Sequence, residues 1–221
     1  MGQPLELTAS DGHAFGAYRA DPAGAPKGAI VVIQEIFGVN QHIRALTDGF
    51  AADGYVAIAP ALYDRAEKGV ELGYDEEGRQ AGMATREKVE WDDVVKDIIA
   101  AREAVADVGK VGIVGYCYGG TVTWLGACKG GFDAAVGYYG GGIHTLLDLD
   151  AGCPVQLHFG EKDQGIPLEN VDKIRGAKSD VDIYVYDGAG HGFVCDERAS
   201  YSEEATNQAR TRTLDFFAAN L

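Results

Sequence analysis

The sequence has little positive charge and no long hydrophobic run. Its 221 residues include 19 Lys and Arg but 34 Asp and Glu, which gives a formal net charge of −15. Nucleic acids and anionic membranes are polyanions, so this charge argues against both as partners. The most apolar stretch, residues 28–39, is interrupted by Gln34 and Glu35. It is also shorter than the roughly 20 apolar residues that span a bilayer.

Cysteine is scarce, and its spacing excludes the common metal and dithiol motifs. The four cysteines are Cys117, Cys128, Cys153 and Cys195, and no pair has CxxC spacing. A zinc ribbon or dithiol redox motif is therefore not expected, and no metal site is predicted. Residues 1–6 show neither the basic start nor the apolar core of a signal peptide. We therefore expect a cytoplasmic protein with free thiols. The absence of a heptad pattern favours a monomer.

Glycine, in contrast, is abundant. The 31 glycines fall between short apolar runs, and such runs are typical of strands that are covered on both faces in a parallel sheet. Strands are expected at residues 27–33, 54–60, 110–115, 134–139, 154–159 and 181–186.

Apolar residues at helical spacing lie between these strands. They predict helices over residues 40–53, 87–108, 121–129, 168–176 and 201–220. This alternation builds βαβ units, so we expect an α/β fold whose mostly parallel central sheet is flanked by helices on both faces. Residues 5–9 and 15–19 flank a Ser-Asp-Gly turn and predict an antiparallel hairpin at the sheet edge.

Residues 61–86 fit neither pattern, because they are polar and interrupted by glycine. They form either a solvated excursion or a cap over a pocket. No repeat or linker marks a boundary, so residues 1–221 are expected to form a single domain.

The sharpest motif is Gly-Tyr-Cys-Tyr-Gly-Gly at residues 115–120, between a predicted strand and a predicted helix. It matches the nucleophile elbow G-x-Nu-x-G, with Cys117 as the nucleophile. Glycine two residues before and two residues after the nucleophile gives the sharp turn its clearance. The helix N-terminus also favours a thiolate. The alternative is a tight turn around a buried cysteine.

An elbow nucleophile needs an acid and a histidine later in the chain, after successive strands. Asp163 and His191 follow the strands predicted at 154–159 and 181–186. His191 can accept the thiol proton, and Asp163 can orient its imidazole. Glu161 and Asp187 are rival acids.

Residues 34–38, Gln-Glu-Ile-Phe-Gly, directly follow the first central strand. In hydrolases of this topology, this loop and the residue after the nucleophile supply the oxyanion-hole N–H groups. The expected donors are Ile36 and Tyr118. Glu35 is either a solvated loop carboxylate or a group in contact with the Cys117 thiol.

With these segments the sequence resembles the dienelactone hydrolase family, the carboxymethylenebutenolidases. The matching residues are 32–40, 111–120, 135–140, 157–163 and 187–193. The resemblance implies an α/β-hydrolase fold without a large lid and a hydrolase that needs no cofactor. It also implies a small lactone or ester substrate, with conversion of carboxymethylenebutenolide to maleylacetate during the degradation of aromatic compounds.

The resemblance further implies roles for individual residues. Cys117 would attack the carbonyl and form a thioester, His191 would move the proton, and Asp163 would support His191. Glu35 would pair with the resting cysteine and assist formation of the thiolate.

The carboxylate-binding arginines of the family are matched only in part. Arg79 lies about where the first is expected, with Arg86 as a rival. The second position, four residues after His191, holds Cys195, and the nearest arginine is Arg198. A general carboxylesterase or thioesterase is therefore the alternative function. A non-catalytic or redox-sensing protein is a third interpretation.

Overall fold

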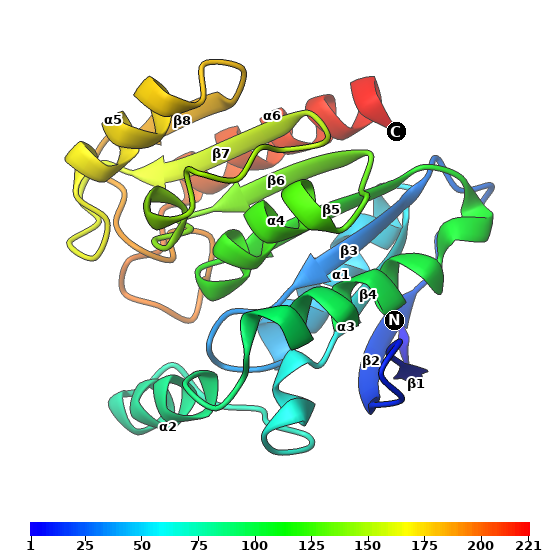
Figure 1. Ribbon diagram of the computed structural model, residues 1–221. Helices are drawn as coiled ribbons and strands as arrows, with labels where there is room; N and C mark the ends of the chain where they lie inside the picture. Colours follow the sequence, from blue (N-terminus) through cyan, green and yellow to red (C-terminus); the bar gives the residue numbers. More distant parts are fainter.

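The computed structural model describes residues 1–221 and contains one eight-stranded sheet (Figure 1). The strands are β1 (Gln3–Thr8), β2 (Ala14–Ala20), β3 (Ala29–Ile33), β4 (Val56–Pro60), β5 (Val111–Tyr116), β6 (Ala134–Tyr138), β7 (Val155–Gly160) and β8 (Asp182–Tyr186). Their order is β1-β2-β4-β3-β5-β6-β7-β8. The β1–β2 hairpin is antiparallel at one edge, and β3 to β8 are parallel. The predicted α/β fold with an N-terminal edge hairpin is confirmed.

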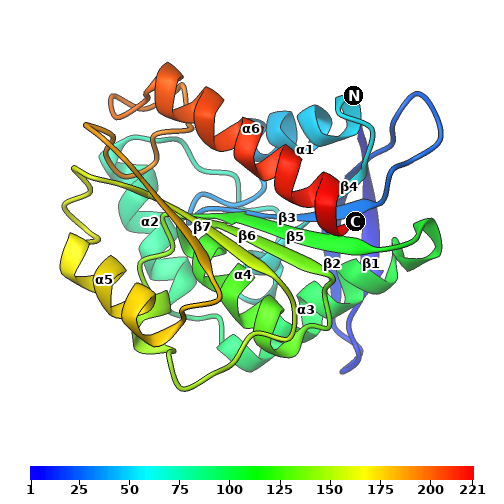
Figure 2. The same ribbon diagram turned by 90° about the horizontal axis from the view of Figure 1, so that it is seen from above.

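Helices cover both faces of the sheet. They are α1 (Gln41–Ala52), α2 (Glu76–Arg86), α3 (Trp91–Glu103), α4 (Tyr118–Lys129), α5 (Leu168–Ala177) and α6 (Glu203–Asn220), with short 3₁₀ turns η1 (Leu62–Arg65), η2 (Ala106–Val108) and η3 (Ile143–Thr145). Figure 2 shows α1 and α6 on one face and α3, α4 and α5 on the other. No helix in the structure has both the length and the apolar character that crossing a membrane requires.

Burial explains why the central strands read as continuous apolar runs. Every residue of β3 to β7 is buried, whereas β8 lies at the edge and is partly exposed. α4 is also buried almost all round, which accounts for its lack of a polar face. The core is one cluster of 51 buried apolar residues.

α2 was not predicted, and its sequence shows why. Its buried residues are Gly78, Gly82 and Thr85, so no stripe of large apolar side chains marks its inner face. Its start is nevertheless well defined, because Asp75 accepts a hydrogen bond from the Gly78 N–H at 2.7 Å. Two glutamates follow in the first turn, where the helix dipole favours negative charge. The predicted helix over 87–108 is shorter than expected and begins at Trp91.

Candidate active site

Cys117 occupies the sharp turn between β5 and α4. Its backbone has φ 56° and ψ −114°, a region that residues with side chains rarely adopt. The turn is held by a hydrogen bond from the Cys117 N–H to the Tyr138 carbonyl at 3.0 Å. A Cβ on Gly119 would come within 2.6 Å of the Gln34 carbonyl oxygen. Glycine is therefore required at position 119, two residues after the nucleophile, because the chain there packs closely against the loop that follows β3.

The structure brings His191 and Asp163 together at the same edge of the sheet. His191 Nδ1 lies 2.7 Å from Asp163 Oδ2. The other carboxylate oxygen accepts the N–H groups of Gly165 and Ile166 at 2.9 and 3.1 Å. The buried carboxylate is thus fixed on both sides. The rival acid Glu161 instead accepts the Gly188 N–H and pairs with Lys162.

The charge around His191 favours its protonated form. Burial lowers the pKa of the imidazole, but the nearby Cys117 and the hydrogen bonds to Asp163 and Cys117 outweigh burial and raise the pKa to about 10. A negative charge on the Cys117 sulfur is therefore balanced by a proton on His191.

Two backbone N–H groups near Cys117 have no hydrogen-bond partner in the protein. Tyr118 is the first residue of α4, so its N–H has no partner within the helix. Ile36 lies in the loop after β3, and its N–H donates no hydrogen bond within the protein. Gln34 fixes this loop by accepting the Leu62 N–H at 3.1 Å. Each amide therefore keeps an unused donor, which is the kind of group that an oxyanion hole requires.

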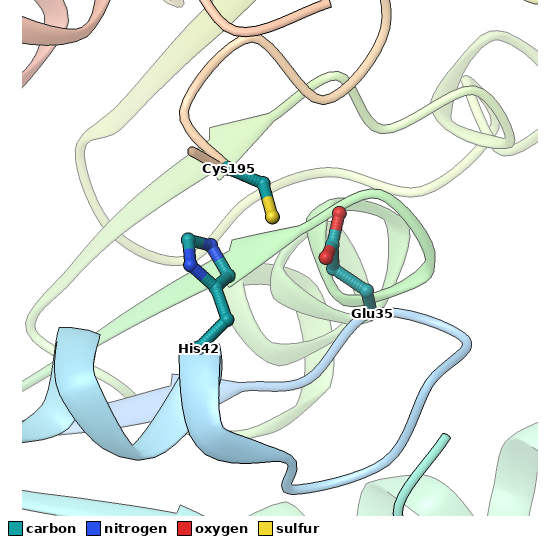
Figure 3. A group of neighbouring side chains, drawn as sticks. All are labelled: Glu35, His42 and Cys195. Atoms are coloured by element: carbon teal, nitrogen blue, oxygen red, sulfur yellow. The ribbon is translucent and has the colours of Figure 1, made fainter. Parts of the chain in front are cut away.

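Glu35 does not make the contact with Cys117 that the sequence suggested. No hydrogen bond joins the two side chains. Glu35 is fully buried and accepts the Tyr74 hydroxyl at 2.7 Å, and its other oxygen lies 3.5 Å from Arg198. The guanidinium supplies the opposite charge that a buried carboxylate needs, which explains this placement. His42 and Cys195 lie beside the same carboxylate (Figure 3).

The arginines differ in their relation to the site. Arg79 lies on α2, is half-exposed and pairs with Glu76 at 2.6 Å. Arg86 stacks on the Trp91 ring at 4.2 Å and does not line the cavity. Arg198 does line it, although the sequence showed Cys195 at the expected position. Sequence spacing alone missed Arg198 as a site residue.

A cavity of about 880 Å³ joins these groups. It is lined by Ile36, Phe37, Arg79, Met83, Cys117, Lys162, Asp163, Gln164, Gly165, Gly190, His191, Arg198 and Ser200. Three of these residues carry positive charge, and Ile36, Phe37 and Met83 form an apolar wall. The segment 61–86 therefore caps the cavity through α2. Such a cavity fits a small molecule with an apolar body and a negative group.

Known proteins that are similar to this chain share one family. The model of the dienelactone hydrolase family matches residues 15–221. A candidate carboxymethylenebutenolidase from Synechocystis sp. is 37% identical over 224 residues, with 92% of this chain and 91% of the relative covered. The carboxymethylenebutenolidase of Pseudomonas putida is 36% identical over 224 residues, with 97% and 95% covered. A solved structure of a candidate dienelactone hydrolase from Klebsiella pneumoniae has a TM-score of 0.84 and 33% identity, with 99% of each chain covered.

Proposed function

Because the chain belongs to the dienelactone hydrolase family, we propose that it opens small lactones that carry a carboxylate, with carboxymethylenebutenolide as substrate and maleylacetate as product. The protein is a hydrolase of carboxylic esters and lactones. The observation that carries the finer proposal is the strained elbow cysteine, which shares one cavity with the His191–Asp163 pair.

In the proposed reaction, Cys117 sulfur attacks the lactone carbonyl carbon and its proton passes to His191. The carbonyl oxygen becomes an oxyanion and accepts the N–H groups of Ile36 and Tyr118. The intermediate then collapses, the ring C–O bond breaks, and His191 gives its proton to the departing oxygen. A thioester is left on Cys117. Water, deprotonated by His191, hydrolyses this thioester and restores the thiol.

Asp163 supports this proton transfer by its fixed position. Its carboxylate holds the Nδ1–H of His191 and so turns Nε2 toward Cys117 and the substrate. The two N–H groups from Gly165 and Ile166 keep the carboxylate in place while the charge on His191 changes. Asp163 is thus a positioning residue that stabilises the imidazolium.

The substrate carboxylate would bind the cations of the cavity. Arg198 is about three-quarters buried, and its guanidinium carbon lies 6.0 and 5.8 Å from the centroids of the neighbouring Phe37 and Tyr74 rings. Its fork is therefore preorganised to bind a carboxylate. Glu35 pairs with Arg198 and so acts as a positioning residue for the guanidinium. Arg79 faces the same cavity from α2.

A general carboxylesterase or thioesterase is the second candidate function. It is favoured by Arg79, whose charge is already balanced by the neighbouring Glu76 on an exposed helix face. The apolar wall of Phe37 and Met83 would also accept a neutral acyl group.

The two functions are separated by kcat/KM for the dienelactone and for p-nitrophenyl acetate. We expect a preference for the lactone, and Cys117→Ala should lower both rates by at least about 10⁴-fold, since the nucleophile is lost. Arg198→Lys should lower kcat/KM for the lactone by about tenfold and leave the neutral ester unchanged, because the two-pronged contact is lost. Arg86→Met, outside the cavity, is the control. Preference for the neutral ester would support the general esterase, and full activity of Cys117→Ala would overturn both.

We further propose that the enzyme works as a cytoplasmic monomer without a nucleic acid or membrane partner. The net charge of −15 repels polyanions. Its exposed large apolar residues, Met1, Met83, Leu168 and Tyr201, are dispersed over separate segments rather than forming one patch. Light scattering during size-exclusion chromatography should give the mass of one chain. The mass of a dimer would contradict this.

A further inference from the structure

A second group of reactive side chains, Glu35, His42 and Cys195, is not among the residues that line the cavity (Figure 3). Glu35 follows β3, His42 belongs to the first turn of α1, and Cys195 lies in the loop after His191. One carboxylate oxygen, one imidazole nitrogen and the thiol sulfur all lie within 4.8 Å of one another. The exposed fractions of the three residues are 0%, 7% and 0%. Nitrogen, sulfur and carboxylate oxygen together form the donor set of zinc sites.

His42 supplies an independent indication of a ligand. Its Nε2 is buried and has no hydrogen-bond partner in the protein. Buried polar atoms are nearly always paired, because an unpaired one is destabilising. Figure 3 shows the His42 ring, the Cys195 sulfur and the Glu35 carboxylate turned toward a common centre. An ion at that centre would satisfy the unpaired nitrogen.

We propose that Glu35, His42 and Cys195 bind a zinc-like divalent cation and that its binding inhibits the hydrolase. Cys195 would release its thiol proton to solvent, and water would complete a four-coordinate site. Zinc bonds of about 2.0–2.3 Å place tetrahedral ligands about 3.3–3.8 Å apart, so the three side chains must close by about 1 Å.

Inhibition follows because the Glu35 carboxylate pairs with Arg198 in the metal-free protein and would bind the cation in the metal-bound protein. Glu35 pairs with Arg198 at 3.5 Å and accepts the Tyr74 hydroxyl. A cation that takes the Glu35 carboxylate repels the guanidinium and separates this pair. Arg198 lines the substrate cavity, so its displacement removes the proposed carboxylate contact. The inhibitory effect rests on the proposed function, whereas the binding of the cation does not.

Binding is tested with cobalt and zinc ions in the Cys117→Ala background, which removes the other candidate thiol of the cavity. Cobalt should give a thiolate charge-transfer band at one equivalent, and zinc should displace it. Adding Cys195→Ser should abolish the band, and adding His42→Ala should weaken binding by more than about 100-fold, the upper range for loss of an outer-shell partner. Cys153→Ser is the matched control and should leave the band intact. No band, or a band that survives Cys195→Ser, would overturn the site.

Inhibition is tested separately with the full enzyme and added zinc. Zinc should lower kcat/KM for the lactone in the parent protein, while Cys195→Ser should keep the metal-free rate and resist zinc. Equal inhibition of both proteins would place the effect at Cys117 and His191 and overturn the regulatory part. Failure of the metal-free parent to hydrolyse any ester would instead count against the proposed function, so the two failures are distinguishable.

Discussion

Cys117 has a strained backbone, and its side chain lies beside the imidazole of His191, which can balance a negative charge on the sulfur. The left-handed backbone at the elbow lifts the sulfur out of the sheet and toward His191. Strain of this kind costs about 1–3 kcal/mol and persists because the surrounding structure imposes it. At this residue the imposing contacts are the Tyr138 carbonyl and the close approach of Gly119 to the loop after β3. The strain thus lowers the stability of the fold but fixes the position of the Cys117 sulfur.

The titration of His191 tests the coupling between these two residues. Burial alone lowers the pKa of this histidine, and Cys117 and Asp163 raise it to about 10. Cys117→Ala removes the first of these raising contributions, so the pKa should fall by about 1–3 units, the usual effect of one nearby opposite charge. NMR titration of the imidazole signals measures this directly. The signals of the partly exposed His144 are the internal control, and an unchanged His191 titration would contradict the coupling.

At the residue scale, the sequence carries local signals for three candidate site residues, and the structure brings these three together. Cys117 is marked by its flanking glycines, and Asp163 and His191 each follow an apolar run. No such local signal marks Arg198, Tyr74 or His42. These residues are part of the site because they lie beside Glu35, which is more than one hundred residues from Arg198 in the chain. No spacing rule relates residues from separate loops and from the first turn of α1, so their meeting is visible only in the fold.

At the scale of elements, Arg65 joins the N-terminal hairpin to η1 and α3. It binds Asp97 on α3 at 2.7 and 3.0 Å and Asp11 in the hairpin turn at 2.8 Å. The Asp97 side chain is fully buried. Burial raises the pKa of Asp97, and Arg65 opposes that rise. Without Arg65 the carboxylate would be a buried, uncompensated charge.

Arg65→Met should therefore lower the free energy of unfolding by about 3–5 kcal/mol at neutral pH, the range for a broken buried ion pair. The pKa of Asp97 rises further in this variant, so the native state binds a proton more readily than the unfolded state. Its stability should then increase, relative to the parent, as the pH is lowered. Urea unfolding at several pH values measures both effects.

A surface pair of the same chemistry provides the control for this prediction. Arg19 and Asp21 are separated by 2.8 Å but are partly exposed, so Arg19→Met should change stability by no more than about 1 kcal/mol. Adding Asp97→Asn to Arg65→Met should recover part of the loss. Equal effects of Arg65→Met and Arg19→Met would show that burial does not govern the pair.

At the scale of the whole molecule, alternating apolar runs and helical spacing were enough to predict the eight strands and five of the six α-helices. The central strands are recognisable in the sequence because β3 to β7 are buried on both faces and are therefore apolar throughout. α2 escaped prediction because glycine and threonine form its buried side. The same helix carries Arg79 and Met83 to the cavity. The least predictable element thus contributes to the substrate-binding side of the site.

We propose that residues 1–221 act as one domain, since one sheet and one core run through them.

The central claim is that Cys117 becomes acylated. It is tested most directly by quenching the parent enzyme in acid during turnover of p-nitrophenyl acetate and measuring its mass. The account predicts one added acetyl group, located on the peptide that contains Cys117, released by hydroxylamine and absent from Cys117→Ala. Hydrolysis without an adduct on that peptide, or at the parent rate in Cys117→Ala, would contradict it.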